Sequence, residues 1–147
     1  MCDGPLYRGK NAVIIVVGGG ERGGHLCVFL SKIARQVILV DKGSDLKMSA
    51  ALRKAVTLLE NVEVLLNTEV QAFIGEDELK GVQVSSPDGQ RKELSADALF
   101  LSIGWVPNVS MIRFPVAATP EGFLKTDANL MTSCVGLFAA GDVRDST

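Results

Sequence analysis

The sequence is poor in the residues that build disulfide and metal sites. Its 147 residues include a single histidine and three cysteines, Cys2, Cys27 and Cys134. No two of these cysteines have a Cys-x-x-Cys spacing, and three cannot pair off evenly. The composition therefore argues against a disulfide scaffold, a structural zinc site and a histidine-based metal cluster.

The sequence also lacks a strong charge of either sign and a long apolar run. Lys and Arg number 15 against 17 Asp and Glu, so the formal net charge is −2. This balance gives no electrostatic footprint for nucleic acid or an anionic membrane. The apolar runs at 12–17 and 98–101 are far shorter than the ~20 residues of a membrane span, and no signal sequence precedes them. We expect a cytoplasmic protein that binds neither nucleic acid nor membrane.

The composition that is present suits one globular domain, and its apolar runs predict a parallel sheet. Hydrophobic residues make up 47% of the chain, and a length near ~150 residues is typical of a single domain. Residues 11–17 form a continuous β-branched run, the pattern of a strand buried on both faces. Helical spacing then starts at residue 21, and a second apolar run covers 36–40. Strand, helix and strand together predict a right-handed βαβ unit.

Further along, the periodicity predicts a second amphipathic helix at 48–60, followed by a core strand at 62–66. Buried strands are expected again at 97–103 and 136–140, with an irregular stretch between them. Three segments alternate apolar and polar positions, which predicts an antiparallel meander; they are residues 69–74, 79–86 and 90–94. The expected fold class is α/β, a Rossmann-like parallel sheet with a β-meander in a three-layer ββα arrangement.

The motif Gly18-x-Gly20-x-x-Gly23 lies between the first predicted strand and the first predicted helix. In this context the three glycines form a dinucleotide-binding fingerprint. Gly18 permits a tight turn with positive φ, Gly20 lets the backbone approach a pyrophosphate, and Gly23 lets the helix close on the strand. The helix N-terminus then offers unpaired N–H groups to the phosphates. The alternative is a glycine turn that holds no ligand.

The residues after the second predicted strand bear on the choice of cofactor. Asp41 stands where an acidic residue accepts hydrogen bonds from the adenosine ribose. Its carboxylate favours NADH and repels the extra phosphate of NADPH, whereas Lys42 and Lys47 attract that phosphate. We favour NADH, since Asp41 is at the strand end, and the two lysines suit a solvated loop equally well.

Four ordered motifs resemble the pyridine-nucleotide domain of the thioredoxin reductase family, which includes the flavoprotein component of alkyl hydroperoxide reductase. They are C-D-G at 2–4 with Y-R-G-K at 7–10, V-G-G-G at 17–20, L-F-L-S-I-G at 99–104 with P-N at 107–108, and G-L-F-A-A-G-D-V at 136–143. The resemblance covers nearly the whole chain. It implies one NAD(P)H-binding domain over 1–147, with 1–9 and 137–147 as connections to an FAD domain. Since no FAD-domain sequence flanks these segments, we expect an excised or truncated central domain.

The resemblance also implies roles for individual residues. Cys2 matches the second cysteine of the family's redox-active Cys-x-x-Cys, and Asp3 matches the acid beside it. The partner cysteine would precede Met1, so we expect no dithiol cycle within this chain. The cofactor-binding positions that match are Gly18, Gly19, Gly20, Glu21, Arg22, Gly23, Asp41, Lys42, Lys47, Ile103, Gly104, Gly141 and Asp142. The last two resemble the FAD-holding Gly-Asp motif.

Some positions depart from the family pattern. Glu21 and Arg22 follow the glycines where the family usually has Asn-Ser or Asn-Thr. A carboxylate beside a pyrophosphate is unfavourable, and Arg22 could offset it as a phosphate clamp. His25 replaces a common glutamate, and we expect it on the surface. Cys27 is expected in the core, and Cys134 has no redox counterpart in the family.

The first functional hypothesis is an NAD(P)H-binding domain that passes hydride to FAD held by another domain of a thioredoxin reductase-like enzyme. Its cofactors would be NADH or NADPH, with FAD only in the complete enzyme. The implied partners are that FAD domain and a thioredoxin-like protein or peroxiredoxin, and homodimer formation stays open. One alternative is a nucleotide-binding or folding module without redox turnover. Another is an inactive paralogue whose altered Glu21-Arg22 turn has lost the nucleotide.

Overall fold

A computed structural model describes residues 3–86 and 88–145, which fall into two compact units. The first unit is Met1–Ile103 and the second is Gly104–Thr147. The expectation of a single nucleotide-binding domain over 1–147 stays a prediction, because compact units and functional domains need not coincide.

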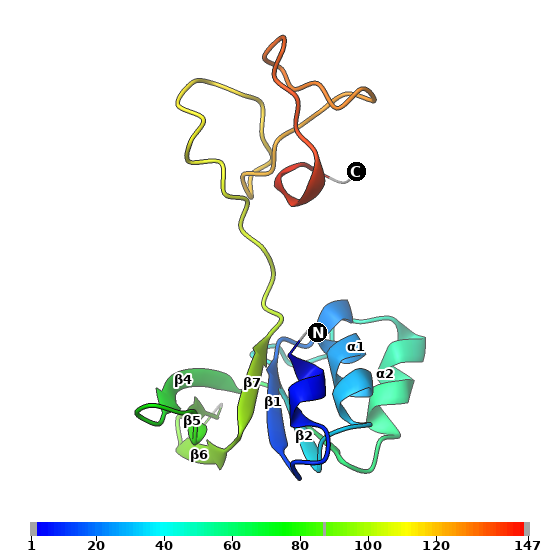
Figure 1. The fold of residues 1–147 in the computed structure, drawn as a ribbon, viewed down its shortest axis with the longest axis vertical. Coiled ribbons are helices and arrows are strands. Elements are labelled where there is room, and N and C mark those ends of the chain that lie inside the picture. The colour runs from blue at the N-terminus through cyan, green and yellow to red at the C-terminus, as the bar shows by residue number, and fades with distance from the viewer. Residues whose placement is uncertain (1–2, 87, 146–147) are drawn as a thin grey trace. The chain divides into compact units, whose positions relative to one another are not determined.

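A four-stranded parallel sheet forms the centre of the first unit (Figure 1). Its strands lie in the order β3-β2-β1-β7, and all neighbours run parallel. Their bounds are β1 Val13–Val17, β2 Gln36–Val40, β3 Val62–Leu65 and β7 Ala98–Leu101. The Val13 N–H donates to the Asp97 carboxylate at 2.8 Å, which joins the start of β1 to the residue before β7. The four strands confirm the sequence prediction for this sheet.

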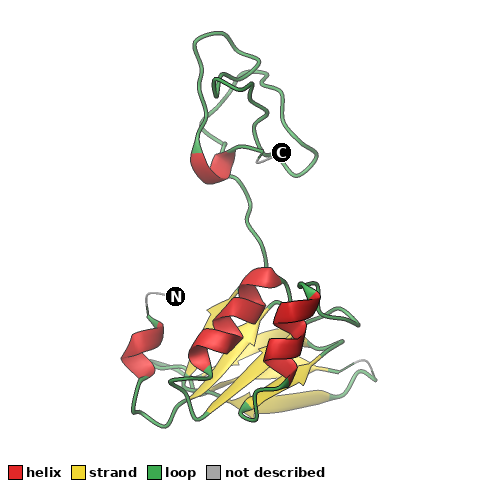
Figure 2. Cartoon of the chain, turned by 90° about the vertical axis from the view of Figure 1, so that its right-hand side faces the viewer, coloured by secondary structure: helices red, strands yellow, loops and turns green. Residues whose placement is uncertain are grey.

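Two helices cover one face of this sheet, α1 Glu21–Leu30 and α2 Ala50–Thr57 (Figure 2). Because successive residues of a strand point to opposite faces, Ile14 and Val16 face the helices and join the cluster that includes Leu30. Within residues 3–86 and 88–145, no helix is both long enough and apolar enough to cross a bilayer.

An antiparallel meander covers the other face, opposite the helices in Figure 1. Its strands are β4 Glu69–Ile74, β5 Gly81–Ser85 and β6 Arg91–Ser95. Val82 and Val84 of β5 and Leu94 of β6 form a second buried cluster with Ile15 and Ile38 of the parallel sheet. Meander, sheet and helices make the three ββα layers that the sequence predicts.

The second helix is shorter than the sequence predicts. The expected range was 48–60, whereas α2 begins after the N-cap Ser49 and ends at Thr57. The apolar spacing continues beyond the helix because Met48 packs into the core from the preceding loop. Leu59 donates its N–H to the Val56 carbonyl in a tight turn that leads into β3.

The second unit, described over 104–145, contains a short 3-10 helix, η2 Gly141–Val143, and isolated β-bridges. The prediction of a buried strand at 136–140 is wrong. Phe138 forms a single bridge with Met131 and is 60% exposed, and Gly136 has a φ of +86°. The apolar residues of this segment have no neighbouring strand in the described part of the unit to extend such pairing. An apolar run forms a buried strand only where a sheet receives it.

Candidate functional site

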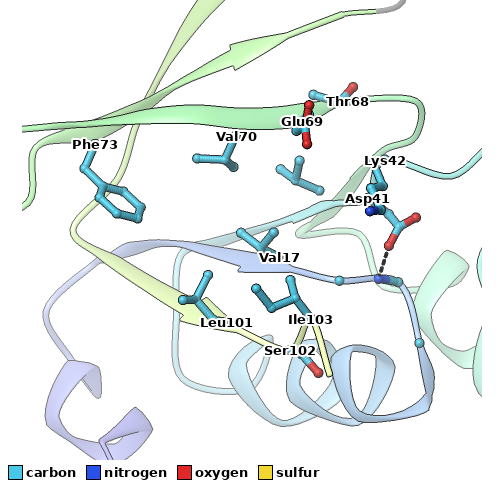
Figure 3. A pocket seen from close by; sticks show the side chains of 14 residues that line it. Val17, Asp41, Lys42, Thr68, Glu69, Val70, Phe73, Leu101, Ser102 and Ile103 are labelled. Atoms are coloured by element: carbon cyan, nitrogen blue, oxygen red, sulfur yellow. Dashed lines mark hydrogen bonds between the residues drawn. The ribbon is translucent and has the colours of Figure 1, made fainter. Parts of the chain in front are cut away.

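A pocket of about 520 Å³ opens at the carboxyl ends of β1, β2 and β7 (Figure 3). Strand β1 has β2 on one side and β7 on the other, so the chain order reverses next to β1. Ligands of open α/β sheets bind at such switch points, outside the carboxyl ends of the strands. The pocket lies where the fold class places a ligand.

The turn after β1 has a backbone that only glycine allows. Gly18 has a φ of +113°, and a Cβ there would lie 2.2 Å from the Ser102 carbonyl oxygen. A Cβ on Gly23 would lie 1.8 Å from the Gly18 carbonyl oxygen, so helix α1 starts in direct contact with the turn. The structure confirms the conformations predicted for Gly18 and Gly23, and their contact with a nucleotide stays a prediction.

Gly20 lies at the N-cap of α1 and faces open space. A Cβ built there would meet only the Lys47 carbonyl oxygen, at 3.9 Å. Gly20 offers no side-chain cap to the ten-residue helix. The start of the helix is therefore accessible to a group with hydrogen-bond acceptors, and the helix dipole favours an anion there. This geometry fits the diphosphate of a dinucleotide.

Asp41 follows β2 and connects the glycine turn to the next loop. Its Oδ2 accepts a hydrogen bond from the Gly19 N–H at 2.5 Å, drawn as a dashed line in Figure 3, and its Oδ1 accepts one from the Gly43 N–H at 2.7 Å. Each carboxylate oxygen can accept more than one hydrogen bond. Asp41 can therefore hold the turn and still accept a bond from a sugar hydroxyl.

The sequence did not reveal that β4 contributes a wall of the pocket. Thr68 and Glu69 lie near Asp41 and Lys42 at the polar end, and Val70 and Phe73 lie toward the apolar end with Leu101 (Figure 3). Phe73 is 64% exposed. The available signal was the position of Thr68 just after the third parallel strand, at the sheet edge where ligands bind. The exposed aromatic ring had no such signal.

Glu21, Arg22 and Lys47 do not line the pocket. The Glu21 carboxylate turns toward helix α2, where its Oε2 accepts the Ser49 N–H at 2.8 Å and its Oε1 accepts the Ser49 hydroxyl at 2.9 Å. The hydrogen bond from the Ser49 N–H is the main reason that the pKa of Glu21 is lowered. Lys47 is exposed, and its backbone forms an isolated bridge with Gly20.

The remaining predicted residues have separate positions. Ile103 lines the pocket together with Lys42. Gly104, Gly141 and Asp142 belong to the second unit, so the structure does not join them to this pocket.

Near the N-terminus, Asp3 precedes a short 3-10 helix, η1 Gly4–Tyr7, and Cys2 lies outside the described residues. Cys27 is fully buried in the helix-side core, as predicted, and burial raises the pKa of its thiol to about 12. His25 is exposed on α1, as expected.

The glycine turn, the acid after β2 and the ββα layers define a Rossmann-like α/β domain. Residues 2–147 match the family model described as pyridine nucleotide-disulphide oxidoreductase. The chain belongs to this family, whose name implies nicotinamide and flavin cofactors.

Two curated relatives align with nearly the whole chain. The chain is 33% identical over 145 residues to the 34.2 kDa protein in the rubredoxin operon of Clostridium pasteurianum. It is 34% identical over 145 residues to the alkyl hydroperoxide reductase F protein of Staphylococcus aureus. These alignments cover 98% of this chain but 46% and 28% of the two relatives.

Solved structures agree on the fold. The thioredoxin reductase of T. acidophilum superposes with a TM-score of 0.85 at 24% identity, covering 99% of this chain and 48% of that one. The thioredoxin reductase of Giardia duodenalis gives a TM-score of 0.74 at 27% identity, also over 99% and 48%. The chain thus spans half or less of the length of these relatives.

Proposed function

We propose that this chain binds NADH or NADPH at the pocket of the first unit and, within a complete protein, delivers hydride to FAD held by another domain. The observation that carries the proposal is the accessible start of α1 at Gly20, next to a glycine turn that Asp41 holds in place. An anion-binding helix end and a sugar-binding carboxylate are the two groups that a dinucleotide needs on this fold.

The residues of the chain divide the work of binding. The backbone from Gly18 to Gly20 and the first turn of α1 would hold the diphosphate, and Asp41 would accept hydrogen bonds from the adenosine ribose. Bound nicotinamide supplies the hydride chemistry, and the protein supplies placement and electrostatics. The pocket has both a polar and an apolar end, which suits a ligand with charged groups and aromatic rings.

The proposed preference is for NADH. The Asp41 carboxylate lies at the end of β2 with both oxygens already oriented by backbone N–H groups, so its negative charge is fixed at the pocket. A 2′-phosphate next to it would be repelled. Lys42 also lines the pocket and opposes this preference, so we expect NADPH to bind more weakly than NADH but measurably.

The complete protein is proposed to be a cytoplasmic, thioredoxin reductase-like disulfide reductase. Its partners would be the FAD domain and a thioredoxin-like protein or peroxiredoxin. Gly104, Gly141 and Asp142 are proposed to serve those cofactors outside this pocket, and Cys2 with Asp3 to belong to the redox centre. The chain alone should have no NAD(P)H-dependent disulfide reductase activity, because hydride transfer requires a flavin in near contact.

Titration calorimetry with NADH and NADPH tests nucleotide binding, with Gly20→Val as the decisive variant. The backbone of Gly20, at φ −82° and ψ −176°, suits any residue, and the added side chain points into open space. The variant should fold but fill the space needed by the diphosphate. Ser44→Val, at an exposed position that does not line the pocket, is the control. Unchanged NADH affinity in Gly20→Val would place the nucleotide elsewhere.

A further inference from the structure

Helix α1 begins with a residue that should hinder the ligand proposed for it. Glu21 occupies the first turn of α1, directly after the open position Gly20. A carboxylate stabilises a free helix N-terminus, because it interacts favourably with the helix dipole. The same carboxylate repels a phosphate that approaches this helix end. Nucleotide binding therefore depends on where the Glu21 side chain points.

The Glu21 side chain is directed away from the pocket by two hydrogen bonds. Ser49, 28 residues further along the chain, donates its N–H to Oε2 at 2.8 Å and its hydroxyl to Oε1 at 2.9 Å. Both carboxylate oxygens are thus held by one residue. His25, one turn along α1, lies 3.9 Å from Oε1 and faces the same carboxylate. Glu21 does not line the pocket, although Gly20 before it does.

The role of Ser49 at this contact differs from that of an ordinary helix cap. Ser49 is the N-cap of α2, but its side chain makes no capping hydrogen bond within α2. Its hydroxyl donates to Glu21 instead. The Glu21 carboxylate thereby lies at the N-terminus of a second helix, where the dipole of α2 also favours negative charge.

We propose that Ser49 and the start of α2 hold the Glu21 carboxylate away from the dinucleotide diphosphate, so that α1 binds an anion in spite of the acid in its first turn. Glu21 and Ser49 are positioning residues in this scheme. The inference rests on the proposed function, since it concerns the same site. It predicts that the charge at position 21 matters little while the side chain is long enough to reach Ser49.

Four side chains at position 21 separate charge from reach. Glu and Gln have the length that contacts Ser49, whereas Asp and Asn are one methylene shorter and fall short of it. Asp and Asn have nearly the same shape, so effects on folding largely cancel between them. The experiment measures the NADH dissociation constant of wild type, Glu21→Gln, Glu21→Asp and Glu21→Asn by calorimetry. Glu60→Gln, an exposed acid that does not line the pocket, controls for net charge.

The expected result is a charge effect in the short pair only. Wild type and Glu21→Gln should bind NADH within about twofold of each other. Glu21→Asp should bind about fivefold more weakly than Glu21→Asn, the effect of two unit charges about 4 Å apart in water. This difference should shrink as ionic strength rises, because the released charge is screened.

Two outcomes would overturn the proposal. Equal affinities of Glu21→Asp and Glu21→Asn would show that a released carboxylate does not meet the diphosphate. A Glu-to-Gln difference as large as the Asp-to-Asn difference would show that Ser49 does not shield the ligand. If wild type and all variants fail to bind NADH, the proposed function itself is wrong and this proposal falls with it. That result differs from the other two because no titration then shows binding.

Discussion

The two units of the chain reach their conformations by different means. In the first unit, two buried clusters pack against opposite faces of the parallel sheet. In the described part of the second unit, Leu124 and Ala139 are the buried hydrophobic residues, whereas Val106 and Val135 are each 90% exposed. The second unit therefore depends on turns and isolated bridges rather than on a core.

This difference implies different local stabilities. Segments with few buried apolar contacts open at low free energy, while core strands open only when the whole unit unfolds. A nucleotide site that must hold its geometry is accordingly expected in the first unit, where the pocket lies at the ends of three core strands. The predictions below test this contrast, beginning with the largest expected effect.

The two described cysteines should differ most. Burial raises the pKa of Cys27 from its ordinary value of 9.0 to about 12, which lowers its thiolate fraction about a thousandfold. Cys134, in the second unit, is only partly buried. In a Cys2→Ser background at pH 8, a thiol reagent should label Cys134 quickly and Cys27 only on unfolding. Peptide mass spectrometry distinguishes the sites, and rapid labelling of Cys27 would contradict a rigid first unit.

Truncation of apolar side chains should show the next largest contrast. Ile15→Ala removes a fully buried side chain between the sheet and the meander, and should lower the free energy of unfolding by about 2–5 kcal/mol. Phe138→Ala, at a 60% exposed position of the second unit, should change it by less than about 0.5 kcal/mol. Urea unfolding followed by circular dichroism measures both values. Similar losses in the two variants would show that the second unit has a core of its own.

Two aspartates with similar hydrogen bonds should differ in their effect on NADH. Asp41 accepts the N–H groups of Gly19 and Gly43, and Asp127 in the second unit accepts those of Asn129 and Met131. Asp41→Ser should weaken NADH binding by about 1.5–3 kcal/mol, the range for hydrogen bonds to a charged group. Asp127→Ser is the matched control and should leave it unchanged.

The same variant also tests the choice of cofactor. Asp41→Ser removes a charge that repels the 2′-phosphate, so NADPH should lose less affinity than NADH or gain some. Calorimetry at two salt concentrations should show this advantage shrinking at the higher one, because the lysine attraction is screened. Equal losses for both cofactors would mean that Asp41 only supports the turn.

The smallest effect concerns acid pH. The pKa of Glu21 is lowered, chiefly by the N–H of Ser49. Its contribution to stability is therefore present above the unfolded pKa near 4.5 and is lost as pH falls through the folded value. The difference in Tm between wild type and Glu21→Gln should shrink from pH 7 toward pH 3. Glu121→Gln, in the second unit, controls for the loss of a carboxylate elsewhere.

Elements that carry their own boundaries could be predicted from the sequence. The second strand was predicted at 36–40 and forms there, because a continuous apolar run ends at Asp41. The helix at 48–60 was overextended, since Met48 keeps the apolar period while lying outside α2. The strand at 136–140 failed because the apolar run has no sheet to join within the described part of its unit.

The site shows the same limit. Gly18 and Asp41 were found because they stand at fixed distances from a strand end, which is local information. The wall formed by β4, with Phe73, and the contact between Glu21 and Ser49 depend on packing between distant segments. No periodicity or motif of the sequence encodes those contacts, so they required the fold.

The bond between Val13 and Asp97 has a consequence for the order of folding. These residues are 84 positions apart, whereas β1 meets β2 after a single helix. Contacts between distant residues require closure of a long loop and form slowly. We expect β1, α1 and β2 to assemble first, the meander to form as a local unit, and β7 to join last. Stopped-flow φ-values should then be higher for Leu39→Ala in β2 than for Leu99→Ala in β7. The carboxyl end of β7, which forms one side of the pocket, would be completed only in this final step.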